Sequence, residues 1–164
     1  MERLPPIDAE RPEDFDAVEA LIDAAFGPGR YAKSAERLRE GNHQLAGVSV
    51  VAREAGVVVG CARMWPVKVG ASPAVLLGPF AVADEMRNKG LGIALVQAAC
   101  EAAAKAGHGL VILVGDAPFF TRAGFAPVDP NAVSFPGPVD MRRVLMRELK
   151  PGAAAGLKGA VTRP

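Results

Sequence analysis

One crossover constrains the fold of this chain more than any other feature. The apolar pattern from Val75 to Val82 predicts a strand, and residues 90–106 follow as an alanine-rich helix that ends at Gly107. The next run, Leu110 to Val114, is apolar throughout, which is typical of a central strand covered on both faces. A strand, a helix and a second strand in this order place the two strands in parallel. The chain is therefore predicted to contain one parallel strand pair.

Other segments around this crossover predict antiparallel strands and further helices. Apolar residues at spacings of three and four predict a helix over 12–26, and Ser34 is a candidate N-cap for a shorter helix over 34–40. The remaining segments predict strands over 48–53 and 57–69 joined by a hairpin near Glu54-Ala55-Gly56, a short helix over 116–122 capped by Asp116, and two final strands over 125–128 and 141–149. We therefore expect a mixed α/β domain, with a mostly antiparallel central sheet flanked by helices.

Two prolines interrupt the predicted strands. Gly78-Pro79 lies inside the strand over 75–82, where it indicates a bulge at which the backbone leaves its ladder. Trp65-Pro66 lies inside the strand over 57–69, so this region is predicted to be an edge, a bulge or the end of the strand.

Size and composition exclude several classes of protein. At 164 residues the chain has the length of one domain, predicted over 1–150, with a Gly/Ala/Pro-rich tail over 151–164 that has no pattern able to form core. A net charge of +1 argues against a nucleic-acid partner, and no apolar run is long enough for a membrane span. The first eight residues lack the apolar stretch of a secretory signal, so we expect a cytoplasmic protein.

The cysteines and histidines argue against a metal. Cys61 and Cys100 belong to no Cys-x-x-Cys pair, and the two histidines form no His-x-x-x-His pair, so no metal site is expected. A disulfide is conceivable on count alone, but two reduced thiols acting as small buried hydrophobes agree better with a cytosolic chain.

The loop after the broken strand indicates an anion site. Arg87-Asn88-Lys89-Gly90-Leu91-Gly92 places two cations and two glycines at the start of the helix over 90–106. Amides in the first turn of a helix have no partners within it and lie at the positive end of its dipole. The segment therefore predicts a phosphate or pyrophosphate site. It lacks both the Gly-Lys-Ser/Thr of a Walker A loop and the third glycine of a dinucleotide-binding fingerprint, where Leu95 stands instead.

Arg-x-x-Gly-x-Gly after a broken strand resembles the acetyl-CoA loop of the GNAT N-acyltransferase superfamily. The resemblance extends to Leu77-Gly78-Pro79-Phe80-Ala81-Val82 and to Gly115-Asp116-Ala117-Pro118-Phe119-Phe120-Thr121-Arg122-Ala123-Gly124-Phe125, which is similar to a segment of the YhbS-like branch. It implies a GNAT fold in which the parallel strands splay apart at Gly78-Pro79. It also implies that acetyl-CoA is the cosubstrate and an amine the acceptor, and it leaves a homodimer as one option.

The resemblance assigns roles to individual residues. Backbone groups of Phe80, Ala81 and Val82 are expected to pair with the pantetheine arm, and Val82 or a neighbour to donate to the thioester carbonyl. The amides from Arg87 through Asn88, Lys89, Gly90 and Leu91 to Gly92 are expected to hold the pyrophosphate, with charge added by Arg87 and Lys89. Asp116, Phe119 and Phe120 are expected to flank the thioester.

The chain departs from the superfamily pattern at the usual general acid. Members commonly have a tyrosine four residues before the glycine that corresponds to Gly124, and Phe120 stands there. Tyr31, the only tyrosine, lies far away in the sequence. A positioned acid is worth about 10²–10⁴ in rate, so reduced activity is expected. Asp116, Glu85 and Glu54 remain weak candidates for the general base, and Asp116 also fits a purely structural N-cap.

The sequence thus predicts an acyl-CoA-dependent N-acyltransferase. The alternative is a non-catalytic acyl-CoA-binding or sensing module that has lost the tyrosine. A structural interpretation is also open, because Arg87 and Lys89 could be solvated loop charges and the glycines a tight helix entry. The acceptor stays open among polyamines, amino acids, antibiotics and protein amino groups.

Overall fold

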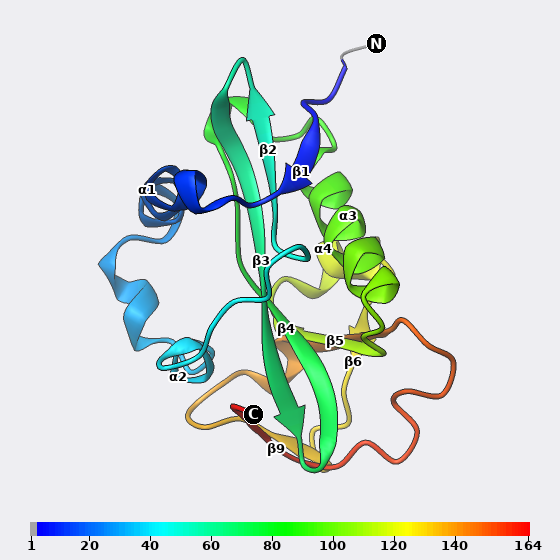
Figure 1. Ribbon diagram of the computed structural model, residues 1–164. Coiled ribbons are helices and arrows are strands. Elements are labelled where there is room, and N and C mark those ends of the chain that lie inside the picture. The colour runs from blue at the N-terminus through cyan, green and yellow to red at the C-terminus, as the bar shows by residue number, and fades with distance from the viewer. Residues whose placement is uncertain (1–2) are drawn as a thin grey trace.

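The computed structural model describes residues 3–164 (Figure 1). Its strands are β1 (Ile7–Ala9), β2 (Val50–Glu54), β3 (Val57–Val69), β4 (Ser72–Val82), β5 (Leu110–Val114), β6 (Ala126–Pro127), β7 (Val133–Ser134), β8 (Val144–Glu148) and β9 (Gly159–Thr162). Its α-helices are α1 (Phe15–Phe26), α2 (Glu36–Arg39), α3 (Leu91–Lys105) and α4 (Ala117–Thr121). Short 3₁₀ turns are η1 (Pro12–Asp14), η2 (Pro28–Ala32), η3 (Asp84–Met86) and η4 (Met141–Arg143).

The main sheet has the strand order β1-β2-β3-β4-β5-β8-β6. Its neighbours along this path pair antiparallel, except that β4 and β5 are parallel. Helix α3 makes the crossover between these two strands, which confirms the predicted fold class. The β2–β3 hairpin turns at Ala55 and Gly56, where φ is 50° and 81°, as a two-residue turn of the favoured hand requires.

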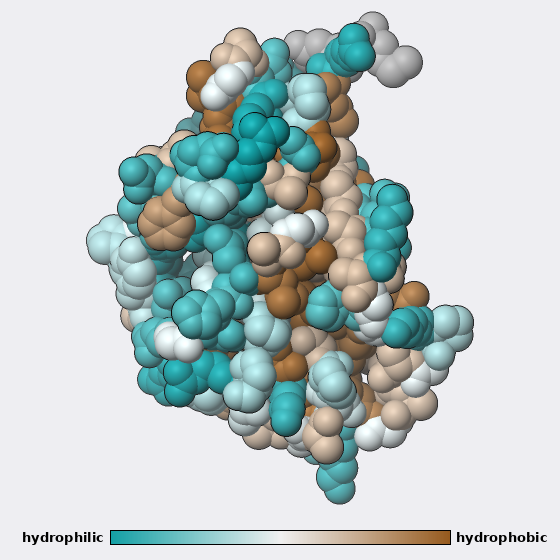
Figure 2. Space-filling view, in the orientation of Figure 1, coloured by the Kyte–Doolittle hydropathy of each residue, from teal (hydrophilic) through white to brown (hydrophobic). Residues whose placement is uncertain are grey.

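Helices α1 and α3 cover opposite faces of the sheet (Figure 1). Neighbouring residues of a strand point to opposite faces, so Cys61 of β3 packs with Val18 and Ile22 of α1, whereas Ala62 and Met64 lie in the cluster under α3. Val18 and Ile22 are fully buried, which contributes about 1.5–3 kcal/mol each. In the same orientation, Figure 2 shows a mostly hydrophilic surface over α1 and α2.

The expectation that residues 151–164 add nothing to the core is wrong. β9 pairs with β3 through Lys68–Thr162 and Val69–Val161, and with β7 in a second parallel pair. Val161 is buried in a cluster with Val69 and Leu76. A four-residue strand of mostly small residues is too short to be recognised from its sequence pattern. It forms a strand because it pairs with β3.

Local details differ from the predictions at two further places. Ser34 does not cap α2, because its hydroxyl donates to the carbonyl of Pro138 instead. The predicted strand over 141–149 begins only at Val144, because the Asp140 side chain accepts from the Arg142 amide and caps η4. Pro66 lies inside β3 and pairs with Val75 of β4, but the opposite edge of β3 is unpaired there, between the pairing with β2 and the pairing with β9, so the predicted local edge is confirmed. No ladder amide is needed there, which is why the proline is tolerated.

Candidate functional site

The parallel strands separate at the predicted position. β4 pairs with β5 only at Val75 and Leu76, next to Val111 and Ile112. Past the cis Gly78–Pro79 peptide, β4 continues to pair with β3 as far as Val82, but within residues 3–164 no strand pairs with its other edge there. The main-chain groups on that edge of Phe80–Val82 are therefore open to an extended ligand.

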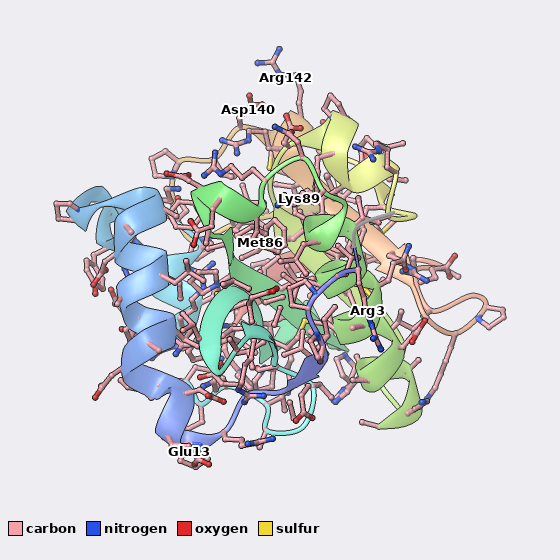
Figure 3. All side chains as sticks on the ribbon, turned by 90° about the horizontal axis from the view of Figure 1, so that it is seen from above. Arg3, Glu13, Met86, Lys89, Asp140 and Arg142 are labelled. Carbon is pink, nitrogen blue, oxygen red and sulfur yellow. The ribbon has the colours of Figure 1, made fainter. Side chains whose placement is uncertain are left out.

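The loop Arg87–Gly92 determines how α3 begins. Asn88 and Gly90 both have left-handed backbone, with φ of 62° and 87°, and Gly90 is the N-cap. The first helical hydrogen bond runs from the Ala94 amide to the Gly90 carbonyl at 3.2 Å, so the amides before Ala94 have no partner within the helix. A Cβ on Gly90 would meet nothing within 4 Å, so the approach to these amides is open. Figure 3 shows Met86 at the end of η3 and Lys89 of this loop, both between α1 and α3.

A first cavity of about 550 Å³ lies between this loop and the open edge of β4. It is lined by Ala25, Phe26, Phe80, Ala81, Val82, Met86, Arg87, Asn88, Gly90, Gly92, Ile93, Phe119 and Arg122. Most of the predicted CoA-binding residues therefore meet in one place. Leu91 is fully buried in the core, so it can contribute only its backbone. The side chain of Arg87 is 58% exposed and 3.2 Å from Asp84.

A second cavity of about 580 Å³ lies where β4 and β5 separate. It is lined by Phe26, Arg30, Lys33, Ser34, Ala35, Arg39, Leu77, Gly78, Pro79, Phe80, Leu113, Val114, Gly115, Asp116, Phe119, Phe120, Pro138, Val139, Asp140 and Arg143. Phe26, Phe80 and Phe119 line both cavities. The two cavities therefore adjoin at a wall of aromatic rings.

Helix α4 supplies part of this wall. The Asp116 carboxylate accepts from the Phe119 amide at 3.1 Å, which confirms the predicted N-cap. The Phe119 and Phe120 rings are 4.9 Å apart, and the Phe80 ring lies 5.6 and 5.9 Å from them. A Cβ on Gly115 would stand 2.5 Å from the Phe120 ring, so a glycine is required before α4.

The candidate acid and base residues are not all brought together. Asp116 and Phe120 line the second cavity, but Glu85 and Glu54 line neither cavity. Tyr31 also lies outside both, with its hydroxyl 2.6 Å from Arg30. Among the residues that the structure describes, no tyrosine hydroxyl therefore reaches the aromatic wall.

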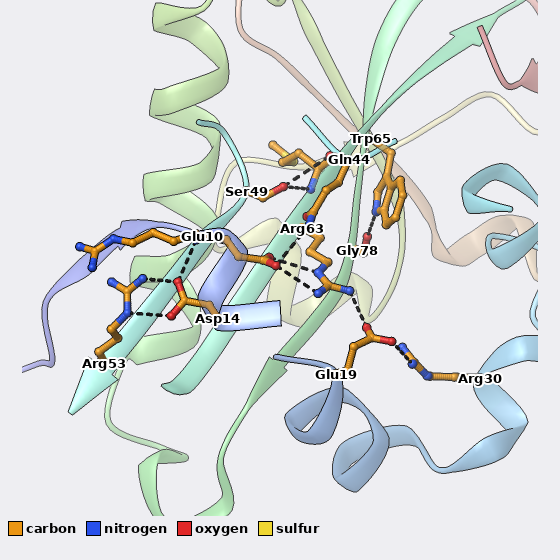
Figure 4. Close-up of polar contacts among 12 residues, drawn as sticks. Glu10, Asp14, Glu19, Arg30, Gln44, Ser49, Arg53, Arg63, Trp65 and Gly78 are labelled. Carbon is orange, nitrogen blue, oxygen red and sulfur yellow. Dashed lines mark hydrogen bonds and ion pairs between the residues drawn. The ribbon is translucent and has the colours of Figure 1, made fainter. Parts of the chain in front are cut away.

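A buried ionic network positions α1 and η2 against the sheet (Figure 4). Arg63 of β3 donates to Glu10 at 3.1 Å and to Glu19 of α1 at 2.6 Å, and Glu19 accepts from Arg30 at 3.1 Å. Burial alone would raise the pKa of Glu19, but hydrogen bonds and charge from Arg63 and Arg30 lower it below its ordinary value. The network fixes Arg30, which lines the second cavity.

The cysteines are poorly suited to nucleophilic chemistry. Burial raises the pKa of Cys61 to about 12 and that of Cys100 to about 11, so both remain protonated thiols near neutral pH. Residues 3–164 contain no group of three or more Asp, Glu, His or Cys placed to hold a metal ion. No helix within the same range is long and apolar enough to cross a membrane.

The sequence interpretation missed the contribution of the N-terminal elements. Ala25 and Phe26 of α1 line the first cavity, and Lys33 and Arg39 line the second. The one local signal in the sequence is an aromatic residue, Phe26, directly before the helix-ending Gly27-Pro28-Gly29. The other N-terminal residues reach the cavities only through tertiary packing, which the local sequence does not predict. Arg122 was missed although it lies within the motif that carried the resemblance.

Comparison with known proteins identifies the family. The family model described as "Acetyltransferase (GNAT) family" matches residues 15–125. The chain is 30% identical over 121 residues to the uncharacterized N-acetyltransferase YhbS of Escherichia coli K12, covering 73% of this chain and 72% of that protein.

Solved structures agree with this assignment. Crystalline Escherichia coli YhbS in complex with CoA is similar with a TM-score of 0.82 and 26% identity, over 100% of this chain and 92% of that one. A Brucella melitensis GNAT acetyltransferase in complex with acetyl-CoA shares the fold, with a TM-score of 0.72 and 24% identity over 97% and 95% of the two chains. The chain belongs to the GNAT acetyltransferase family.

Proposed function

We propose that this protein is an acyl-CoA-dependent N-acyltransferase that moves an acetyl group from acetyl-CoA to an amine. The observation that carries the proposal is the pair of adjoining cavities at the separation of β4 and β5. The first cavity contains the open amides at the start of α3. The second is lined by charged, apolar and aromatic side chains. The CoA and acetyl-CoA held by the two related crystal structures support the choice of cosubstrate.

The cosubstrate extends along the first cavity. The amides preceding Ala94, together with Arg87 and Lys89, bind the pyrophosphate, since a helix start combines free donors with a positive dipole end. The pantetheine arm pairs with the open edge of Phe80–Val82, and an amide of that edge donates to the thioester carbonyl. The thioester then lies at the aromatic wall.

The reaction is a direct displacement. The amine nitrogen enters from the second cavity and attacks the carbonyl carbon, the carbon–sulfur bond breaks, and the amine loses its proton. Asp116 lines this cavity and lies three residues before Phe119 of the aromatic wall. Its carboxylate takes that proton directly or through water. The phenyl ring of Phe120 has no proton to give, so water protonates the departing thiolate, whose ordinary pKa near 8.5 makes this acceptable.

A coupled assay tests the proposal. The protein is mixed with acetyl-CoA and a panel of primary amines, and both free CoA and the acetylated amine are measured. The proposal predicts amine-dependent CoA release with a matching yield of acetylated product. The loss of the tyrosine favours a second candidate, an acyl-CoA-binding or sensing module. That module would bind acetyl-CoA but release no CoA with any amine.

A further inference from the structure

The second cavity has more cationic than anionic side chains available to a ligand. Its lining includes four cations and two carboxylates: Asp140 is already bonded to Arg142 at 3.0 Å, and Asp116 caps α4 and is the carboxylate assigned the amine proton. Arg30 is compensated by Glu19 and Asp23 at 3.1 and 3.0 Å. Figure 3 shows Asp140 and Arg142 at the outer rim of the molecule.

Lys33, Arg39 and Arg143 remain incompletely compensated. The ammonium of Lys33 lies over the Phe26 ring, 4.5 Å from its centroid. The Nε of Arg143 donates to the Gly115 carbonyl at 3.1 Å, and within residues 3–164 no carboxylate forms an ion pair with it. Lys33 follows η2, Arg39 ends α2 and Arg143 ends η4, so three separate elements bring these cations to one cavity.

Arg39 is the most constrained of the three. Its Nη1 pairs with Glu36 at 2.9 Å, and the side chain is only 13% exposed. Its Nε is buried and has no hydrogen-bond partner within the described residues. A Cβ on Gly78 would lie 2.9 Å from its Nη2, so the guanidinium lies against the backbone where β4 leaves β5. A buried, fork-shaped cation with an unused donor is well suited to a carboxylate or phosphate.

The three cations also affect one another. The pKa of Lys33 is lowered by the partial burial of its side chain and by the positive charges of Arg143 and Arg39. Like charges gathered in this way raise the free energy of the unliganded protein, and a bound anion offsets that repulsion. Apolar side chains such as Leu77, Leu113 and Val139 complete the lining.

We propose that the amine acceptor also carries an anionic oxygen group, a carboxylate or a phosphate, which Lys33, Arg39 and Arg143 bind in the second cavity. This inference rests on the proposed acyl transfer and names its substrate class. The apolar lining accommodates the body of the acceptor, and the aromatic wall receives its amino group.

Matched acceptors test the inference. Initial rates with acetyl-CoA are compared for L-leucine against L-leucinamide and for O-phosphoethanolamine against ethanolamine, which separates a carboxylate from a phosphate. In one of the two pairs, kcat/KM should be at least tenfold higher for the anionic member. Binding of N-acetyl-L-leucine and N-acetyl-L-leucinamide in the presence of CoA is measured by calorimetry as a readout that needs no turnover.

Variants assign the preference to the cations. Lys33→Gln and Arg143→Gln change exposed side chains and should fold, and each should cut the anionic preference at least threefold through KM. Arg39→Lys keeps the charge but loses the fork, and should have the same effect. Lys105→Gln, at the far end of α3, removes one positive charge and should leave the preference unchanged.

The outcomes separate this inference from the proposed function. Transfer to amines with equal rates for both members of each pair, and no effect of the variants, would overturn the inference and leave the acyltransferase intact. No transfer to any amine, but charge-dependent binding of N-acetyl-L-leucine that Lys33→Gln weakens, would refute the acyltransferase and support the anion site. Absence of both the preference and the binding would overturn the inference outright.

Discussion

Phe120 occupies the position at which this chain departs from its superfamily. Its ring is 7% exposed, packs edge-on against Phe80, Phe119 and Phe125, and lines the second cavity. A tyrosine there would add one hydroxyl with little change in volume, and the neighbouring cavity offers that hydroxyl access to water. The residue is therefore the most direct probe of how the thiolate leaves.

Phe120→Tyr should raise turnover at least tenfold if thiolate departure limits the rate, which equals about 1.4 kcal/mol off the barrier. CoA release is measured with one acceptor identified in the coupled assay. Phe125→Tyr serves as the control, because Phe125 belongs to the same aromatic cluster but lines neither cavity. A clear loss of rate in a folded, CoA-binding Phe120→Tyr variant would show that the phenyl ring itself is required.

Single residues were predictable where their role is local. Asp116 caps α4 as the pattern of α4 indicates, because an Asp side chain reaches an amide three residues ahead without help from the rest of the fold. Ser34 and Arg39 were not predictable in this way. The hydroxyl of Ser34 binds Pro138 and the guanidinium of Arg39 lies against Gly78, contacts that join residues distant in the sequence.

At the scale of elements, the crossover and the β2–β3 hairpin follow from patterns in the sequence. The broken strand β4, the glycines before α3 and the apolar strand β5 each carry a strong local signal. Strand β9 has no such local signal, although it pairs with β3 near the C-terminus (Figure 1). Val161 is its one buried residue, so its existence depends on the surface that β3 and β7 present.

Val161→Ala tests how much β9 contributes. Removing two methyl groups from a side chain that is 1% exposed should lower the free energy of unfolding by about 1–3 kcal/mol. Val57→Ala is the control, since Val57 is 62% exposed and should change stability by less than about 0.5 kcal/mol. Urea unfolding of both variants measures the difference. Equal, small effects would mean that β9 adds nothing to the fold.

At the scale of the whole molecule, one ionic network links the N-terminal segment, α1, η2 and the sheet. Glu19 lies at its centre, between Arg63 and Arg30. Because its pKa in the folded state lies below the ordinary value of 4.5, its stabilising effect is fully present above that pH and is lost as the pH falls through the lowered pKa. The protein should therefore lose stability in acid partly through this carboxylate.

Glu19→Gln should cost about 1–3 kcal/mol at pH 7 and progressively less as the pH falls below 4.5, where the Glu19 carboxylate of the unfolded chain takes up a proton before that of the folded protein does. Denaturant unfolding from pH 7 to pH 3 follows the difference. Glu101→Gln, an exposed change on α3, should show little cost at any pH. A penalty for Glu19→Gln that stays constant down to pH 3 would show that the charge of Glu19 does not stabilise the fold.

CoA binding at the start of α3 is the central claim, and two glycines of the same helix test it most directly. Gly90 and Gly107 flank α3, have φ of 87° and 93°, and would each place a Cβ in open space. Alanine therefore costs similar backbone strain at both, about 1–2 kcal/mol, but only Gly90 lines the first cavity. Calorimetric titration with CoA should show affinity at least tenfold weaker for Gly90→Ala and unchanged for Gly107→Ala. Equal affinities in two folded variants would contradict the assignment of this loop as the CoA site.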